Sequence, residues 1–357
     1  MNIRNRYYWK DKGLIHPLVL FSIWRRKGGR SMSLEQQSLL LLTSWFFSGL
    51  RKSELVMPVY LVNYLGEQIL VTRECKAFLN SCPHRGTQLL SADSDNNKIV
   101  CPYHRWTFDL QGECIGAPFC TKEESNVRLR PVSLEVWHNL IFLSFGNPVS
   151  LSERFRPMEP YISDCPIETF SQKHHLVREL ETHWKLAHQN FSENVHSIFW
   201  HPELEERSTN DGSCPDELRS ILAVHGDHFD TGTTIGNSLT GSTKRYSGSK
   251  KIVYFSIYPN LLPSLTGDYL FIQRFMPLSD STTQIDCYFY VAPDVDMNDV
   301  VDFWMTVFEQ DRMICEAAQR GNSSRFFPGN HYTQHDVEVK IFTDKLEQEL
   351  EEGNNLR

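Results

Sequence analysis

Two short loops in the N-terminal half of the chain each contain one cysteine and one histidine. Cys82 and His84 lie in Cys-Pro-His-Arg-Gly, and Cys101 and His104 lie in Cys-Pro-Tyr-His-Arg-Trp, which gives the spacing C-x-H-x16-C-x2-H. Thiolate and imidazole groups are both good ligands for transition metals. The pattern therefore predicts a metal centre that two loops grip from opposite sides.

Two kinds of metal centre fit these four residues. Two Cys and two His suit a structural zinc ion, but zinc fingers usually keep the two Cys together and the two His together, whereas here each loop supplies one of each. In a Rieske [2Fe–2S] cluster, two thiolates hold one iron and two imidazoles hold the other. The pattern closely resembles the Rieske domain, which would make the chain a carrier of single electrons.

A second group of candidate ligands lies further along the chain, in the run from residue 183 to residue 202. On a helix, Asn190, Glu193 and His196 follow one another at i,i+3 spacing and share one face. His201 follows His196 by five positions, which turns it about 140° away on a regular helix. Both imidazoles can meet one metal only if the helix ends or widens between them, and Pro202 favours an ending.

A carboxylate completes this second group. Asp311 falls in phase with the apolar stripe of the predicted helix over 299–320, and an acid on a buried face is costly unless it is paired or binds a metal. Two His and one carboxylate form the facial triad of non-haem Fe(II) oxygenases. The alternative for Asp311 is a buried salt bridge or a helix cap.

Together the two motifs resemble the Rieske non-haem iron oxygenases, specifically their catalytic α subunit, over about residues 38–345. The resemblance implies an α+β fold, with an N-terminal antiparallel β Rieske [2Fe–2S] domain and a C-terminal helix-grip (START-like) catalytic domain. It implies one [2Fe–2S] cluster per subunit on the ligands Cys82, His84, Cys101 and His104. It also implies one Fe(II) per subunit on the ligands His196, His201 and Asp311.

The resemblance further implies how electrons reach the iron. The cluster of one subunit would serve the iron of its neighbour in a homotrimer, and Glu193 matches the acidic residue that bridges a histidine of each centre. Asn190 belongs to the same catalytic run. The sequence has no Gly-rich dinucleotide fingerprint, so electrons would come from NAD(P)H through a separate reductase or ferredoxin, and O₂ would be the oxidant.

The substrate is less well defined than the chemistry. The chain looks most like the choline, carnitine and glycine-betaine monooxygenases, which hydroxylate or demethylate small quaternary ammonium compounds. Such substrates need an aromatic cage, for which we consider Tyr254, Tyr258, Tyr269 and Phe271, with the loop 231–249 at the cavity entrance. Two alternatives remain: a ring-hydroxylating dioxygenase of an aromatic substrate, and a Rieske electron-transfer protein without oxygenase activity.

The pattern of short apolar runs positions these residues in two domains. We expect an N-terminal extension and lead-in at 1–50, the Rieske domain at 51–150 and the catalytic domain at 151–357. Alternating and β-branched runs predict strands. In the first domain they lie at 59–65, 68–73, 77–80, 98–100 and in two parts of 129–144, and in the second at 251–258, 268–275 and 285–292.

Composition limits the function classes. A formal net charge of −8 over 357 residues argues against nucleic acid as a partner. Nine cysteines without paired spacing favour a reducing cytoplasm, and no apolar stretch is long enough to predict a membrane span. The first thirty residues hold eight Lys and Arg against one acid, which leaves organelle targeting open, and Met32 is a possible alternative start.

Overall fold

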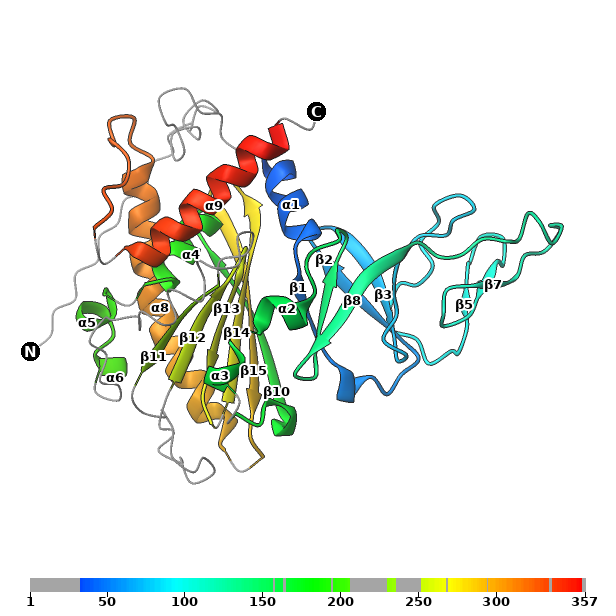
Figure 1. Ribbon diagram of the computed structural model, residues 1–357, viewed down its shortest axis with the longest axis horizontal. Coiled ribbons are helices and arrows are strands. Elements are labelled where there is room, and N and C mark those ends of the chain that lie inside the picture. Colours follow the sequence, from blue (N-terminus) through cyan, green and yellow to red (C-terminus); the bar gives the residue numbers. More distant parts are fainter. Residues whose placement is uncertain are drawn as a thin grey trace, which may run out of the picture.

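The chain folds into a β-rich N-terminal part and a larger mixed part, seen at the two ends of Figure 1. This computed structural model describes residues 33–354 except 157, 163–164, 194, 206–229, 236–251, 268, 294 and 334–335. The basic segment at residues 1–30 and Met32 therefore lie outside the described residues. None of the helices in the described ranges is both long enough and apolar enough to cross a membrane.

The N-terminal part is built on a six-stranded antiparallel sheet preceded by helix α1 (Leu34–Thr43). Its strands follow the order β1 (Phe46–Arg51), β9 (Leu140–Ser144), β8 (Pro131–Trp137), β4 (Ala77–Leu79), β3 (Glu67–Thr72) and β2 (Val59–Tyr64). A single turn of 3-10 helix, η2 (Lys52–Glu54), follows β1. The division at residues 51 and 150 stays a prediction, and β1 lies across its first boundary.

A small three-stranded sheet forms the outer tip of this part (Figure 1). Its strands are β5 (Ile99–Val100), β6 (Thr107–Phe108) and β7 (Cys114–Gly116). The short strands alternate with tight turns, which is how a segment with many Gly, Pro and Asp residues stays compact. The tip therefore consists largely of loops, and the two Cys–His motifs lie in them.

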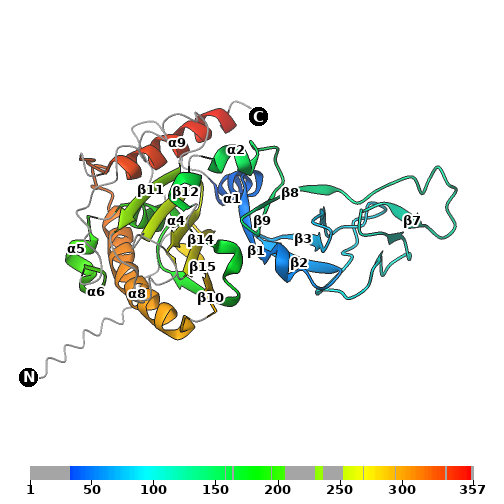
Figure 2. The ribbon, with the colours of Figure 1, turned by 60° about the horizontal axis from the view of Figure 1, so that its bottom comes forward.

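The C-terminal part opens with α2 (Leu151–Phe155), α3 (Glu159–Ile162) and the 3-10 turn η3 (Ile167–Thr169). A six-stranded antiparallel sheet follows in the order β10 (Gln172–Leu180), β15 (Thr282–Val291), β14 (Tyr269–Ser279), β13 (Leu261–Leu265), β12 (Ile252–Ile257) and β11 (Asp230–Ile235). Helices α4 (Trp184–Phe191), α8 (Met297–Asn322) and α9 (Val337–Asn354) lie against it (Figures 1 and 2). The sheet wraps around the long helix α8, and the predicted fold class is confirmed.

One apolar core joins the two parts. Phe47 of β1 contacts Phe142 of β9 and Tyr288 of β15, with ring centroids 5.7 and 5.1 Å apart. Gly49 permits this approach, because its φ is +83° and a Cβ there would lie 2.9 Å from the Tyr288 ring. The buried Arg274 of β14 donates to the Phe47 carbonyl across the same boundary. The two parts are therefore packed as one body.

The tip has a separate, smaller core. Phe78, Trp106, Phe108 and the two cysteines Cys82 and Cys101 are buried in it. In Figures 1 and 2 this tip and the short helices α5 (Ser197–Trp200) and α6 (Pro202–Glu205) lie at opposite ends of the molecule. The two predicted metal centres of one chain are consequently far apart.

Helix α8 has the predicted amphipathic pattern. Its buried positions include Val300, Trp304, Val307, Asp311 and Cys315, which recur at the spacing of one helix face. The Asp296 side chain caps the helix by accepting a hydrogen bond from the N–H of Asn298 at 2.9 Å. On the outer side of α8, charged residues pair with one another. Arg312 lies 2.7 Å from Glu309 and 3.3 Å from Glu316.

The run from 183 to 202 is not the continuous helix that we considered. Helix α4 ends at Phe191, and α5 begins only at Ser197, so Asn190, Glu193 and His196 do not share one helix face. The Glu193 carboxylate accepts hydrogen bonds from the N–H groups of Val195 and His196, at 2.5 and 3.3 Å, and so closes a turn in the backbone. The chain is thereby redirected before the first predicted iron ligand.

Candidate functional site

The two Cys–His loops meet at the tip with their cysteines inside and their histidines outside. Cys82 and Cys101 are almost completely buried, whereas the rings of His84 and His104 lie towards the surface with centroids 4.8 Å apart. Burial raises the pKa of the Cys82 thiol, and the adjacent Cys101 raises it further. Thiols of this kind need a metal to be held as thiolates.

The two loops have the same backbone arrangement. The N–H of Gly86 donates to the carbonyl of Cys82 at 2.8 Å, and the N–H of Arg105 donates to the carbonyl of Cys101 at 3.1 Å. Gly86 and Arg105 hold equivalent positions and both have a positive φ, of 73° and 61°. Arg105 therefore adopts a conformation that glycine adopts without steric cost.

In the part of the chain that the structure describes, one group of His, Cys, Asp and Glu side chains brings three potential ligand atoms within 4.8 Å of one another, and it consists of His196, His201 and Asp311.

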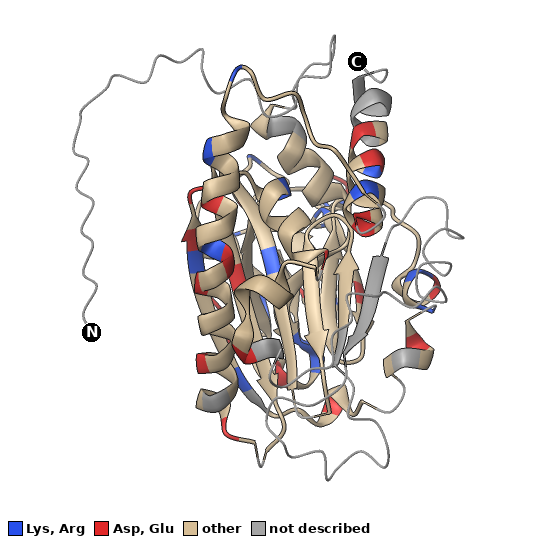
Figure 3. Ribbon diagram, turned by 90° about the vertical axis from the view of Figure 1, so that its left-hand side faces the viewer, with Lys and Arg blue, Asp and Glu red and all other residues tan. Residues whose placement is uncertain are grey.

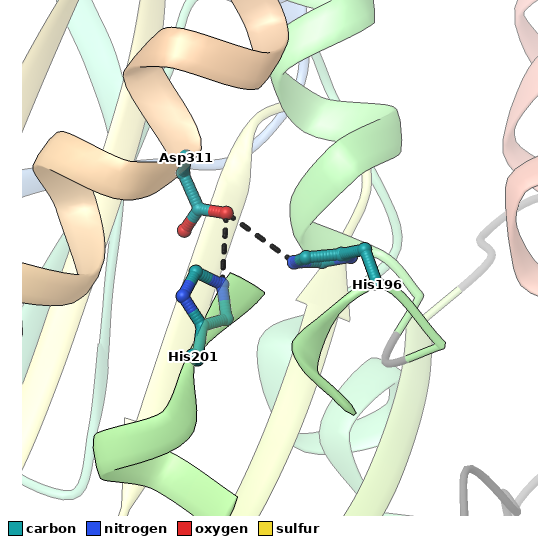
Figure 4. Close-up of side chains that lie close together, drawn as sticks. All are labelled: His196, His201 and Asp311. Carbon is teal, nitrogen blue, oxygen red and sulfur yellow. Dashed lines mark hydrogen bonds and ion pairs between the residues drawn. The ribbon is translucent and has the colours of Figure 1, made fainter. Parts of the chain in front are cut away.

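The second centre lies between α8 and the segment around α5, and Figure 4 shows its three side chains converging. The Nε2 atoms of His196 and His201 lie 3.2 and 3.1 Å from Oδ1 of Asp311. Ligands about 2 Å from one ion and at right angles to each other lie about 3 Å apart. These distances fit three donors that would hold one ion together.

Both histidines are oriented through their other ring nitrogen. Nδ1 of His196 lies 2.5 Å from Glu193 Oε1, and Nδ1 of His201 lies 2.6 Å from Gln310 Oε1. The Gln310 amide in turn donates to Glu203 Oε2 at 3.0 Å. Because each Nδ1 faces an oxygen acceptor and donates its proton there, Nε2 is the ring nitrogen that is directed to a metal.

Gln310 is a residue whose role sequence reasoning missed. It precedes Asp311 in a run shared with the resembled family, but on a helix adjacent residues point in different directions, so no shared role was expected. The Gln310 side chain nevertheless joins the site, because the His201 ring lies beside α8 and its Nδ1 is 2.6 Å from Gln310 Oε1. The amide of Asn190 also reaches the centre and donates to Asp311 Oδ1 at 2.8 Å.

Electrostatics favours a cation at this centre. Burial opposes protonation of His196, but Asp311 and Glu193 outweigh it and raise the pKa of His196 to about 9. Burial likewise opposes ionisation of Asp311, and its hydrogen bonds to the two histidines hold the pKa of this carboxyl below its usual value. The site thus holds Asp311 as a carboxylate and attracts a proton to His196. A divalent metal ion would fit there in place of that proton.

A pocket adjoins the three ligands, which form part of its lining. Strands β12 to β14 and helix α8 line it with Tyr254, Ser264, Gln273, Trp304 and Val307, among others. Of the four aromatic residues considered for a cage, only Tyr254 lines this pocket.

The other three candidates lie in the core. Tyr258, Tyr269 and Phe271 are buried there, and the cage prediction is wrong for them. Trp304 was predicted only as part of the apolar stripe. Residues 231–235 of the predicted entrance loop are part of β11, and its remaining residues, 236–249, lie outside the described residues.

Two known protein families match consecutive parts of this chain. Residues 50–136 match the Rieske [2Fe-2S] domain. Residues 167–352, more than half of the chain, match the ring hydroxylating alpha subunit (catalytic domain). The first match covers the tip loops, and the second covers all three converging ligands.

Individual relatives are more distant. A glycine betaine monooxygenase oxygenase subunit of Pseudomonas aeruginosa is 25% identical over 84% of this chain and 82% of its own length. A carnitine monooxygenase oxygenase subunit of Acinetobacter baumannii is 25% identical over 87% of this chain and 85% of its own.

Among solved structures, a quaternary ammonium Rieske monooxygenase studied for carnitine oxidation by gut microbiota and inter-subunit electron transfer superimposes with a TM-score of 0.67. It is 20% identical and covers 88% of this chain and 91% of its own. At this identity the likeness bears on the fold alone. With the two matched domains following one another in the sequence, the chain belongs to the Rieske oxygenases with a ring-hydroxylating α-subunit catalytic domain, and it is an oxidoreductase.

Proposed function

We propose that the tip holds one [2Fe–2S] cluster on Cys82, Cys101, His84 and His104, and that His196, His201 and Asp311 hold one Fe(II). The convergence of two Nε2 atoms and one carboxylate oxygen within hydrogen-bond distance carries this proposal. When bound, the cluster and the iron supply one-electron transfer and O₂ activation. The protein's own residues orient the ligands, and the pocket holds the substrate beside the iron.

We infer a small quaternary ammonium compound as the substrate and hydroxylation or demethylation by a monooxygenase as the reaction. The names of the relatives support this class. So does the pocket, where Tyr254 and Trp304 both lie in the wall with ring centroids 6.0 Å apart, since aromatic rings attract a cation. The described lining residues include the acids Glu193 and Asp311 but no Lys or Arg.

We further propose a homotrimer in which the tip of one subunit faces the iron of the next. An electron cannot cross a whole chain efficiently, and the two centres lie at its opposite ends (Figure 1). Apolar side chains beside the iron site are exposed on α5, where Phe199 is 77% and Ile198 50% exposed. Tyr103 and Phe119 are exposed in the same way on the tip, at 58% and 108%. Head-to-tail contact of two different surfaces closes into a ring.

The proposed electron source is an NAD(P)H-dependent reductase or a ferredoxin. The eight cysteines of the described ranges form no disulfide among themselves, which fits a reducing compartment such as the cytoplasm. Charges of both signs are interspersed on the face of the catalytic part in Figure 3. A reductase or ferredoxin that binds this face would be selected by its shape and apolar contacts as much as by its charge.

The test is substrate-dependent O₂ uptake by the iron-loaded protein with a surrogate reductase, combined with mass analysis of the product. We expect uptake and an oxidised product with glycine betaine, carnitine or choline. Product from an aromatic compound instead would assign the chain to the ring-hydroxylating dioxygenases. A reducible cluster without product from any compound would favour an electron-transfer protein and contradict the oxygenase proposal.

A further inference from the structure

Two polar atoms in the wall of the pocket lack a partner. The indole Nε1 of Trp304 and the amide Oε1 of Gln273 are completely buried and have no hydrogen bond within the described structure. Their side chains come from different elements, α8 and β14, and their residues are only 4% and 3% exposed. Native proteins rarely leave buried polar atoms unsatisfied, so a bound group is the natural partner for this pair.

Both residues line the same pocket, and Trp304 lies towards its end away from the iron ligands. Trp304, Val307 and Asp311 follow one another at i, i+3 and i+7 on α8, so Trp304 lies about 10 Å along the helix axis from Asp311. Phe271 contacts the Trp304 ring with centroids 5.0 Å apart. Gln273 lies two positions after Phe271 and therefore on the same face of β14.

The chemistry of the two atoms selects a group. An indole N–H can only donate a hydrogen bond, and an amide oxygen can only accept one. A hydroxyl group satisfies both, because it accepts from Trp304 and donates to Gln273. A carboxylate has acceptors only, and among the described residues that line the pocket there is no Lys or Arg to balance its charge.

We propose that Trp304 and Gln273 determine specificity by holding an uncharged hydroxyl group of the substrate. The inference rests on the proposed function and narrows it to a small cationic alcohol, whose ammonium group contacts the aromatic walls. A site built to bond a hydroxyl rejects analogues without it, because its own buried polar atoms would then stay unpaired. The same pair should also discriminate against a carboxylate in that position.

The experiment measures dissociation constants for the iron-loaded protein by calorimetry with three probes: choline, ethyltrimethylammonium, which lacks only the hydroxyl, and glycine betaine. We expect choline to bind at least about tenfold more tightly than ethyltrimethylammonium. Gln273→Met, which keeps the side-chain length, and Trp304→Phe, which keeps an aromatic ring, should each reduce this preference to about threefold or less.

Leu262→Val is the matched control, because it alters the pocket wall without removing a polar atom. It should keep the preference for choline. If Trp304→Phe does not fold, Gln273→Met alone decides the question.

Three results would overturn the inference: equal or no binding of the two probes by the unaltered protein, tighter binding of glycine betaine than of choline, or a preference that survives in the variants. The binding measurements test this inference, whereas turnover tests the proposed function. Turnover of quaternary ammonium compounds without a hydroxyl preference would leave the function standing and remove only the inference. Failure of all such compounds to support O₂ uptake would count against the function itself.

Discussion

Each histidine of the proposed iron site presents Nε2 to Asp311 and Nδ1 to an oxygen from a neighbouring side chain. The two Nδ1 partners differ in charge, because Glu193 is a carboxylic acid and Gln310 is an amide. An ionised partner makes its histidine more basic, while an amide only fixes the ring. The two ligands of one ion are therefore supported in different ways.

Replacing Gln310 by Leu should weaken iron binding by about 10- to 100-fold, because His201 loses the acceptor that fixes its ring. Titration of iron into the metal-free protein measures this effect. The control is Glu309→Gln, one position earlier on α8, where the side chain is exposed and pairs with Arg312. Equal iron affinity in the Gln310 variant and the control would exclude the orienting role.

Replacing Glu193 by Ala should leave the cluster in place and, with iron loaded to saturation to offset the weaker support of His196, reduce coupled turnover by about 100-fold. The reason is that a carboxylate between two imidazoles couples their proton and electron states. Metal analysis, cluster reduction and product yield per O₂ consumed are the measurements. Near-normal product formation would rule out the bridging role that we propose for Glu193.

Among the elements, those with a strong repeating pattern were predictable from the sequence. The apolar stripe of α8 placed Asp311 on a buried face, and alternating runs predicted β2 and β3 to within one or two residues of their ends. Strand β1 was missed, because its residues read as part of an apolar run that also includes the end of α1. Strand β13 carries Pro263, which is unusual within a sheet and weakens the prediction of a strand.

The iron site was predictable in its ligands but not in the geometry that joins them. The spacing of His196 and His201 required a break in the helix, and we placed that break between the two residues. The chain turns earlier as well, after Phe191, since the Glu193 side chain bonds to local backbone N–H groups. Side chain to backbone bonds of this kind leave no periodic signal in a sequence.

Helix α4 carries a pH-sensitive residue away from the iron. His188 is fully buried, stacks on Phe342 with centroids 3.9 Å apart, and its Nδ1 lies 3.0 Å from Ser192 Oγ. Burial lowers the pKa of His188 to about 3. As the pH falls, the His188 ring is protonated near pH 6.5 in the unfolded chain but only near pH 3 in the folded protein. The stability that neutral His188 contributes is therefore present above about pH 6.5 and is lost as the pH falls towards 3.

We therefore expect the free energy of unfolding to decline on acidification in part through His188. One such group contributes a slope of about 1 kcal/mol per pH unit in that range. His188→Gln should make the slope shallower by about this amount, even though it lowers stability at neutral pH. Urea denaturation at several pH values between 4 and 7 tests this, and parallel slopes for the two proteins would contradict it.

At the scale of the whole molecule, helix α5 leaves large apolar side chains exposed to solvent. Phe199 and Trp200 are 77% and 44% exposed, directly before the ligand His201. Large apolar side chains grouped at the surface mark interaction sites. In the proposed ring, the tip of a second subunit covers them.

Phe199→Asp should therefore shift the protein from trimer to monomer and abolish turnover, because no neighbouring cluster would face the iron. Cluster reduction should be unaffected in this variant. Sedimentation velocity and O₂ uptake are the measurements, with Phe326→Asp as the control, since Phe326 is 93% exposed beyond the end of α8. A trimeric and active Phe199 variant would contradict the predicted contact.

The apolar core shared by the N-terminal sheet and the catalytic sheet has a consequence for kinetics. Since Phe47, Tyr288 and Arg274 tie the two sheets together, the N-terminal sheet that carries the tip is packed against the catalytic part of its own chain. In the proposed ring, the tunnelling distance between a cluster and the iron of the next subunit would then be set once, on assembly. The timing of each electron would depend on substrate and protons at the iron, and not on the diffusion of a tethered domain.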